Sequence, residues 1–164
     1  MSGALRDNRD MWTCPVCGQS FVTRNMPHSC QVVGLDEFFA GSELRDLFEL
    51  YVAAARENGP VTVNATKSRI SLQVRMRFAA VQRPRKRYLP AHFVLTRPVE
   101  SPRLDVEYLP PYYYVHKLRL AQPADVDDEL GGWLAEAYQI GEQRHVSDPG
   151  WRRERTAPDW VKFP

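Results

Sequence analysis

Four side chains near the start of the sequence have the types and spacing of metal ligands. Cys14 and Cys17 are separated by two residues in CPVCG, and His28 and Cys30 close the cluster in HSC. Thiolates and imidazoles suit tetrahedral zinc, and a two-residue gap lets both sulfurs of one tight turn face the same ion. Because four ligands fill the tetrahedral shell, we expect a structural zinc ion rather than a catalytic one, which keeps a position open for water.

The residues around these ligands fit a small unit that the metal organises, which we expect to span residues 1–34. Gly18 follows the second cysteine directly, where the turn needs a positive φ. Trp12 and Phe21 are its expected apolar padding. The His-x-Cys ending differs from the second ligand pair of common fingers and no long helix is expected within the cluster, so we do not predict a DNA-reading finger.

The composition limits the class of protein. The 164 residues are 43% hydrophobic and 26% charged, which is the balance of a globular chain. The sequence has no run of 18 apolar residues, so we expect no membrane-spanning segment. The first residues have no apolar stretch of the kind that marks a secretion signal, and we therefore expect a cytoplasmic protein, where three cysteines serve metal binding better than disulfides.

Hydrophobic periodicity predicts an α+β body over residues 35–146. Three- and four-residue steps predict a helix over 44–55, behind Ser42 as N-cap, and a second helix over 125–138. Alternation with period two predicts strands over 69–78, 91–97, 104–109 and 112–120. A helix, a run of hairpin-linked strands and a second helix favour an antiparallel sheet with both helices on one face. The tail, residues 147–164, has no periodicity and is expected to be irregular.

The longest alternating stretch assigns the two faces of this sheet. We expect the side of the sheet under the helices to carry Ile70, Leu72, Val74, Met76 and Phe78. The alternate positions are polar and include three arginines, whose burial would require partners for three charges. The other face of the sheet is therefore predicted to meet solvent.

Several segments together resemble a known family. They are WTCPVCGQSF, HSC and LDEFF, followed by GPVTVNATKSRISL, FAAV, VHKLRL and DVDDELGGWLAEAY. The combination is similar to a family of uncharacterised bacterial domains, sometimes labelled a predicted transport protein, that occurs alone, behind zinc-binding knuckles or fused to nuclease-like modules. The resemblance spans roughly residues 12–138 and implies the α+β fold and the zinc unit. It implies no catalytic residue.

The charge distribution favours a polyanion as partner. Residues 60–120 contain twelve Lys and Arg against three Asp and Glu. Cations that neutralise phosphates, with rings that stack on bases, are how sheet surfaces hold single-stranded nucleic acid. The candidate binding residues are Arg69, Arg75, Arg77, Tyr113, Lys117 and Arg119, and His92 is a further ring on the same face. The sequence thus predicts a binding module for single-stranded nucleic acid or another polyanion.

Two alternatives use the same residues differently. The basic face could be a protein-interaction or oligomerisation surface. Lys67 and His116 could instead meet at one end of the sheet and form a small pocket for an anionic ligand, although a histidine on the apolar side of a strand is more often a core residue. The usual catalytic motifs, such as a Walker A loop or GxSxG, are absent from the sequence, so we assign no catalytic residue.

Overall fold

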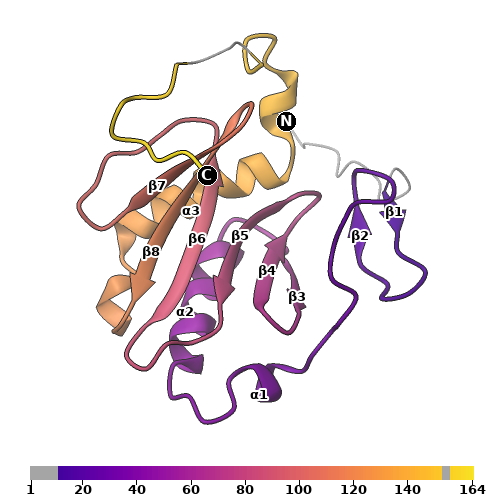
Figure 1. Cartoon of the computed structure of the whole chain (residues 1–164), viewed down its shortest axis with the longest axis vertical. Helices are drawn as coiled ribbons and strands as arrows, with labels where there is room; N and C mark the ends of the chain where they lie inside the picture. The colour runs from indigo at the N-terminus through magenta and orange to yellow at the C-terminus, as the bar shows by residue number, and fades with distance from the viewer. Residues whose placement is uncertain (1–10, 153–155) are drawn as a thin grey trace.

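The structure, a computed structural model, describes residues 11–152 and 156–164 and has the predicted α+β class (Figure 1). Its strands are β1 (Trp12–Thr13), β2 (Ser20–Phe21), β3 (Thr62–Ala65), β4 (Arg69–Gln73), β5 (Arg77–Gln82), β6 (Leu89–Leu95), β7 (Asp105–Leu109) and β8 (Tyr113–Leu120). Its α-helices are α1 (Leu35–Phe38), α2 (Arg45–Arg56) and α3 (Asp128–Gly141), with short 3-10 turns at Pro123–Asp125 and Arg144–Ser147. Among the described residues, no helix has the length and apolar character needed to cross a membrane.

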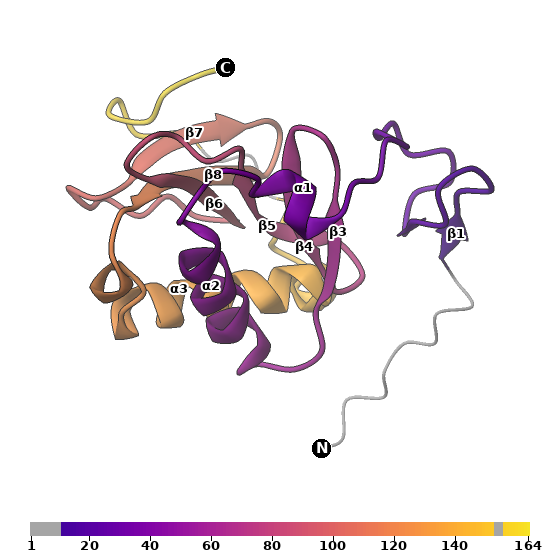
Figure 2. The ribbon, with the colours of Figure 1, turned by 90° about the horizontal axis from the view of Figure 1, so that it is seen from below.

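The sheet has two clearly different faces. Its strand order is β3-β4-β5-β6-β8-β7 with antiparallel neighbours throughout, and the ribbon of β1 and β2 forms a separate pair. Figure 2 shows α2 and α3 packed on one side of the sheet, as predicted. We call the side away from these helices the outer face. Its central row consists of paired residues on successive strands: Asn64, Ser71, Ala80, His92, Lys117 and Asp105.

The two central strands follow the predicted alternation closely. On β6 the buried positions alternate with half-buried ones, and Ala91, Phe93 and Leu95 point to the helices. On β8 the predicted inner residues are all buried, which are Tyr114, His116, Leu118 and Leu120. Because side chains in a strand point to opposite faces in turn, this pattern fixes which residues the outer face receives.

The helices cover the sheet through the predicted apolar stripes. Helix α2 buries Leu47, Tyr51 and Ala55, and the hydroxyl of Tyr51 donates to the backbone carbonyl of His92 at 2.8 Å. Helix α3 begins later than predicted, after Asp127, whose carboxylate accepts from the backbone N–H of Leu130. A side-chain acceptor at this position satisfies one of the free N–H groups of the first helical turn. The helices are therefore anchored by burial and by local capping together.

The prediction of one strand over residues 69–78 is wrong. The chain turns at Val74, Arg75 and Met76, so that β4 and β5 form a hairpin. The carbonyl of Gly141, at the end of α3, accepts hydrogen bonds from the backbone N–H groups of Arg75 and Met76 and holds the turn. Val74 and Met76 are consequently only half-buried, whereas the predicted neighbours in the core are fully buried.

A β-bulge restores the correct facing after this turn. Gln73 pairs with Arg77 and Leu72 pairs with Ala79, so β5 has one extra residue, Phe78. A bulge of this kind re-aims a side chain, and Phe78 enters the core against the ring of Tyr138. The alternation in the sequence thus continues through a turn and a bulge that the periodicity does not distinguish from an uninterrupted strand.

The outermost strands of the sheet each receive a partner from a terminal segment. At β3, the connector that follows the metal cluster forms a bridge between Val32 and Thr66, and the N–H of Val33 donates to Ala65. At β7, the final segment runs parallel to the strand, with a bridge between Glu107 and Lys162. The tail that we expected to be irregular therefore includes a short stretch that pairs with the sheet.

Candidate functional site

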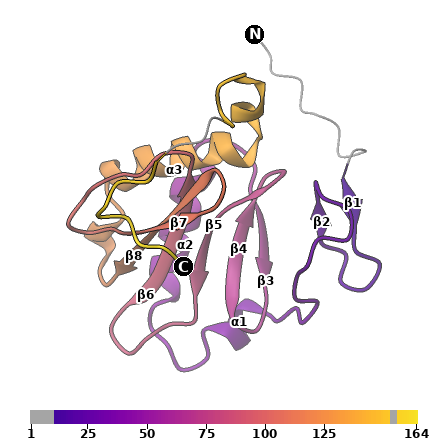
Figure 3. The ribbon, with the colours of Figure 1, turned by 45° about the horizontal axis from the view of Figure 1, so that its top comes forward.

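The four predicted ligands converge in one cluster. The segment that carries them, which includes β1 and β2, lies beside β3 (Figures 1 and 3). Their sulfur and nitrogen atoms all lie within 4.8 Å of one another. The sulfurs of Cys14 and Cys30 are 3.8 Å apart, and Nε2 of His28 lies 3.3 Å from one sulfur and 3.4 Å from another. A tetrahedral zinc ion requires separations of about 3.8 Å between sulfurs and about 3.5 Å between sulfur and nitrogen. The cluster therefore fits a metal ion with four protein ligands.

The backbone around the cluster prepares the ligands for a cation. Gly18 has a φ of +74°, as expected, which closes the turn between Cys14 and Cys17. The backbone N–H groups of Cys17 and Val16 donate to the sulfur of Cys14 and lower its pKa to about 6. A thiol that ionises easily is ready to act as a thiolate ligand.

The histidine is oriented by a second hydrogen bond. Nδ1 of His28 donates to the carbonyl of Met26 at 2.6 Å, which raises the pKa of the imidazole and leaves Nε2 as the atom that faces the sulfurs. Hydrogen bonds of this kind to the other ring nitrogen are typical of metal-bound histidines. The ring also packs on Phe21, with centroids 4.6 Å apart, so the predicted apolar padding lies against a ligand.

The metal-binding unit, residues 11–34, lies against the outer face of the sheet. The amide of Gln73 donates to the carbonyl of Ser20, and the guanidinium of Arg77 lies 4.8 Å from the ring centroid of Phe21. Ser71 and Gln73 are buried although they are polar and point away from the helices. The prediction that this face meets solvent is thus wrong at Gln73 and Arg77, because the metal-binding unit contacts the sheet there, whereas Arg69 and Gln82 at the other end of the hairpin are exposed.

Gln19 connects the metal cluster to the sheet. Its Nε2 donates to the sulfur of Cys17 at 3.3 Å and to the carbonyl of Ser29 at 3.0 Å. Its Oε1 accepts from Nη2 of Arg77 at 2.9 Å. The side chain is 5% exposed, and both of its ends are in use. One buried amide therefore joins a metal ligand, the backbone between two ligands and an arginine of β5.

A polar pocket of about 320 Å³ lies where the unit meets the sheet. We call it the arginine pocket, and its lining residues are Ser29, Thr66, Ser68, Arg69, Ser71, Arg77 and Gln82. Within the part of the chain that the structure describes, neither arginine has an ion-pair partner. Burial, and then the charge of Arg69, lowers the pKa of Arg77. The charge of Cys17 acts in the opposite direction. The pocket therefore combines two arginines that have no ion-pair partner among the described residues with several hydroxyl groups.

Two residues of the predicted polyanion-binding set lie apart from Arg69 and Arg77. Arg75 belongs to the turn between β4 and β5, where its Nε donates to Oε1 of Gln143 at 3.0 Å. Tyr113 forms a hydrogen bond with Nε2 of His145 and packs beside Trp151. The predicted row of Arg69, Arg75 and Arg77 is therefore wrong, because the hairpin removes its middle member. The predicted row also required Arg77 to point freely to solvent, but this side chain is half-buried.

The remaining cations lie on β8 across the outer face. Lys117 forms an ion pair with Glu107 at 2.6 Å, and the guanidinium of Arg119 lies 4.7 Å from the ring centroid of Tyr88. His92 lies between the two groups of cations. Burial, followed by the charges of Arg69 and Lys117, lowers its pKa to about 4. Cationic side chains thus occur on β4, β5 and β8 of the outer face, although Lys117 is paired with Glu107.

The predicted contact between Lys67 and His116 is not present. Lys67 lies in the exposed turn that joins β3 to β4. His116 lies on β8, which is separated from β4 by β5 and β6. His116 is fully buried on the helix side, where its Nε2 accepts from the N–H of Val99 at 3.0 Å and its ring stacks on Phe93. His116 is therefore a core residue with its hydrogen bonds satisfied, and these two residues form no joint pocket.

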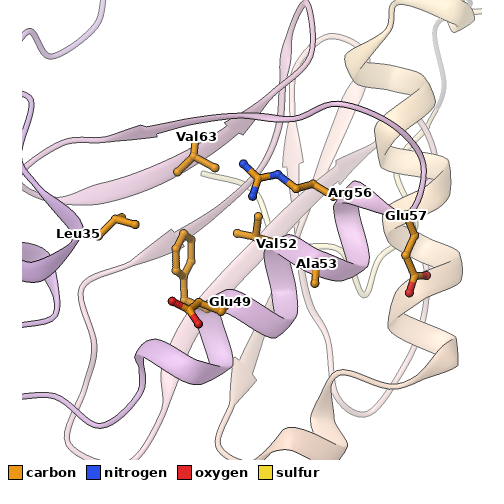
Figure 4. Close-up of a pocket in the computed structure, with 8 residues that line it drawn as sticks. Leu35, Glu49, Val52, Ala53, Arg56, Glu57 and Val63 are labelled. Atoms are coloured by element: carbon orange, nitrogen blue, oxygen red, sulfur yellow. The ribbon is translucent and has the colours of Figure 1, made fainter.

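A larger and more apolar pocket lies on the helix side of the molecule (Figure 4). It has a volume of about 640 Å³, and Leu35 of α1, Val52 of α2 and Val63 of β3 face one another across it. The side chain of Arg56 extends over it and donates to the carbonyl of Val61 at 3.3 Å. This pocket shares no lining residue with the arginine pocket, and the apolar alternation that defines the core gives no sign of it in the sequence.

The fold and the cluster together define an α+β domain preceded by a small unit whose Cys/His cluster is consistent with a metal site. The chain belongs to the family described as a domain of unknown function (DUF5655), whose model matches residues 35–141. No curated protein and no solved structure gives a significant match. The family match confirms the resemblance to an uncharacterised family, and it leaves the four metal ligands outside the matched region.

Sequence reasoning missed the residues that connect the two parts of the site. Gln19 and Ser29 stand beside the metal ligands in the sequence, but nothing in their type marks them as contacts to a sheet. Ser71 and Gln73 were assigned to a solvent-exposed face because they alternate with apolar residues. The sequence offers one indirect indication of this contact. Ser71 and Gln73 are uncharged residues among arginines, and uncharged side chains can be covered by another segment at little cost.

Proposed function

We propose that this chain is a binding module for single-stranded nucleic acid or another polyanion, and that zinc organises the unit that completes its binding surface. The arginine pocket carries the proposal. Two neighbouring cations without a carboxylate partner among the described residues repel each other, and an anionic ligand would relieve that repulsion. The surrounding hydroxyl groups are donors that suit phosphate oxygens.

The wider outer face supports a ligand longer than one phosphate. Arg119 and Lys117 on β8 extend the positive surface across the sheet, and His92 lies between them and Arg69. A chain of phosphates could cross these strands, with contacts that are electrostatic and independent of sequence. Tyr113, Arg75 and Lys117 support the proposal least, because each already has a partner in the structure.

Zinc is the metal that the donor set favours. Three cysteines and one histidine in tetrahedral spacing form a soft ligand shell, which selects zinc over the hard cations that prefer oxygen. We expect one zinc ion per chain in protein that is purified without added metal. Elemental analysis measures it, and a chain that carries no zinc would contradict this part of the proposal.

Fluorescence anisotropy with labelled single-stranded DNA and RNA tests the binding function. If four cations contact phosphates, the logarithm of the affinity should fall with the logarithm of salt concentration with a slope of about −3. Replacing Arg69 or Arg119 with glutamate should weaken binding and make this slope shallower by about 0.7 each. Arg56→Glu is the matched control, because it makes the same charge change on the helix side of the sheet.

Two outcomes would contradict the proposal. The first is no detectable binding at low salt. The second is an equal loss of affinity in Arg56→Glu and Arg69→Glu, which would indicate a general charge effect. A solution mass above that of the monomer, reduced by Arg69→Glu, would instead favour the oligomer interface as the use of this surface.

A further inference from the structure

Arg77, which lines the arginine pocket, has a donor that the rest of the described chain does not use. Nε of Arg77 is buried and has no hydrogen-bond partner among the described residues, although Nη2 of the same group donates to Gln19. A buried donor without a partner is unfavourable, so such groups usually have a ligand, an ion or a water molecule to bond. The unpartnered Nε of Arg77 therefore favours a ligand with an acceptor atom beside this side chain.

The pocket has the size and chemistry of a site for one phosphate group. Its volume of about 320 Å³ exceeds what a single water molecule needs and is small for a folded polymer. The guanidinium groups of Arg69 and Arg77 can donate to two oxygens of an oxyanion, and Ser71, two residues after Arg69 on β4, also lines the pocket. Ser29 contributes from the metal-binding unit.

Gln19 is one of the contacts through which the metal-binding unit reaches this pocket. Gln19 fixes the carbonyl of Ser29 and the guanidinium of Arg77, and it bonds the sulfur of Cys17. Ser29 itself stands between two of the metal ligands. Without a metal ion the four ligands have no common centre, and the positions of Ser29 and Gln19 are then no longer fixed.

We propose that the arginine pocket binds one phosphate group and that metal ligation assembles the pocket through Gln19. The inference rests on the proposed polyanion-binding function and makes it more specific: it identifies one phosphate position and makes that position dependent on the metal. The phosphate can belong to the backbone of a nucleic acid, to its 5′ end or to a free phosphate ion, and the chemistry of recognition is the same for all three.

Isothermal titration with inorganic phosphate at constant ionic strength tests the pocket directly. Arg69→Gln should weaken phosphate binding by about tenfold or more, since a charged hydrogen bond is lost and no contact to the metal-binding unit is touched. Gln19→Leu should cause a similar loss while the chain keeps one metal ion, because all four ligands remain. Arg56→Gln is the matched control, because it removes the same charge on the helix side of the sheet, and it should leave phosphate binding unchanged.

Metal removal gives a second measurement that does not depend on a variant. Protein that is treated with a chelator, and then freed of it by dialysis, should lose phosphate binding and regain it when the metal is restored. Circular dichroism in each state checks that the α+β body stays folded. Oligonucleotides with and without a 5′ phosphate, compared by anisotropy, distinguish a terminal phosphate from the backbone as the source.

Each outcome decides between the two levels of the proposal. Equal phosphate affinity in the wild type and Arg69→Gln overturns the pocket, and full affinity in metal-loaded Gln19→Leu and in metal-free protein overturns the coupling. If oligonucleotides bind but phosphate does not, the inference fails and the binding function stands. If phosphate binds as described but oligonucleotides do not, the nucleic-acid function fails and the phosphate site stands.

Discussion

The metal-binding unit and the α+β body are held together by different forces. Of the described residues before Leu35, only Cys14 and Phe21 are buried hydrophobic side chains, and Cys14 belongs to the Cys/His cluster. The body instead has a continuous core that joins both helices to the inner face of the sheet. Burial of apolar surface stabilises the body, whereas ligation must stabilise the unit. The two regions should therefore respond to different perturbations.

Loss of one metal ligand should have the largest effect and should be confined to the unit. Metal binding contributes on the order of 10–16 kcal/mol in zinc-finger peptides, so Cys17→Ser should release the metal and loosen residues 12–30. The body should stay folded, because its core does not include these residues. Elemental analysis and NMR amide signals measure both effects. A variant that keeps its metal, or whose body unfolds, would show that the two regions are not independent.

Truncation of a core side chain should affect the body and leave the metal in place. Leu72 is fully buried on the inner face of β4, and Leu72→Ala should lower the free energy of unfolding by about 2–5 kcal/mol. Val74→Ala is the matched control, because the same apolar pattern includes Val74 but the structure places it in the half-buried turn. Denaturant unfolding compares the two variants. Equal losses would contradict the hairpin and favour one continuous strand.

Acidification should destabilise the body through His116. Burial lowers the pKa of this imidazole from 6.5 to about 4. The unfolded chain therefore binds a proton at a higher pH than the folded chain, and the stability from this group is complete above about pH 6.5 and is lost as the pH falls toward 4. The loss is at most about 3 kcal/mol.

The variant His116→Gln separates this effect from proton binding at the metal ligands. Glutamine can accept from Val99 but does not titrate, so the variant should lose less stability between pH 6.5 and pH 4 than the wild type does. Denaturant unfolding at several pH values measures the difference. Identical pH profiles would show that His116 does not cause the loss of stability in acid. The difference in stabilising forces between the unit and the body would not be affected by that result.

The sequence predicted best those features that local spacing determines. The ligand spacing of Cys14, Cys17, His28 and Cys30 identified the cluster because the chemistry of one ion requires it. The strict alternation on β6 and on β8 identified the buried side of each strand, since both strands are central in the sheet and are covered on one side by helices. In both cases the determining contacts repeat at a fixed interval along the chain.

Features that depend on distant segments could not be predicted in the same way. The turn at Val74 contains no glycine or proline, and its hydrogen bonds come from Gly141 at the end of α3. The burial of Gln73 and Arg77 depends on the position of the metal-binding unit, which the alternation of β4 and β5 does not encode. The arginine pocket exists only when these two pieces meet, so no local pattern indicates it.

The pairing of terminal segments with β3 and β7 has a consequence for the behaviour of the chain in concentrated solution. An outermost strand normally presents unpaired N–H and C=O groups, which can recruit a strand from another molecule and begin aggregation. Val33 takes up the carbonyl of Ala65 on one side, and Lys162 takes up groups of Val106 and Tyr108 on the other. The two segments thus occupy part of each outermost strand and should reduce the tendency of the sheet to extend from one molecule to another.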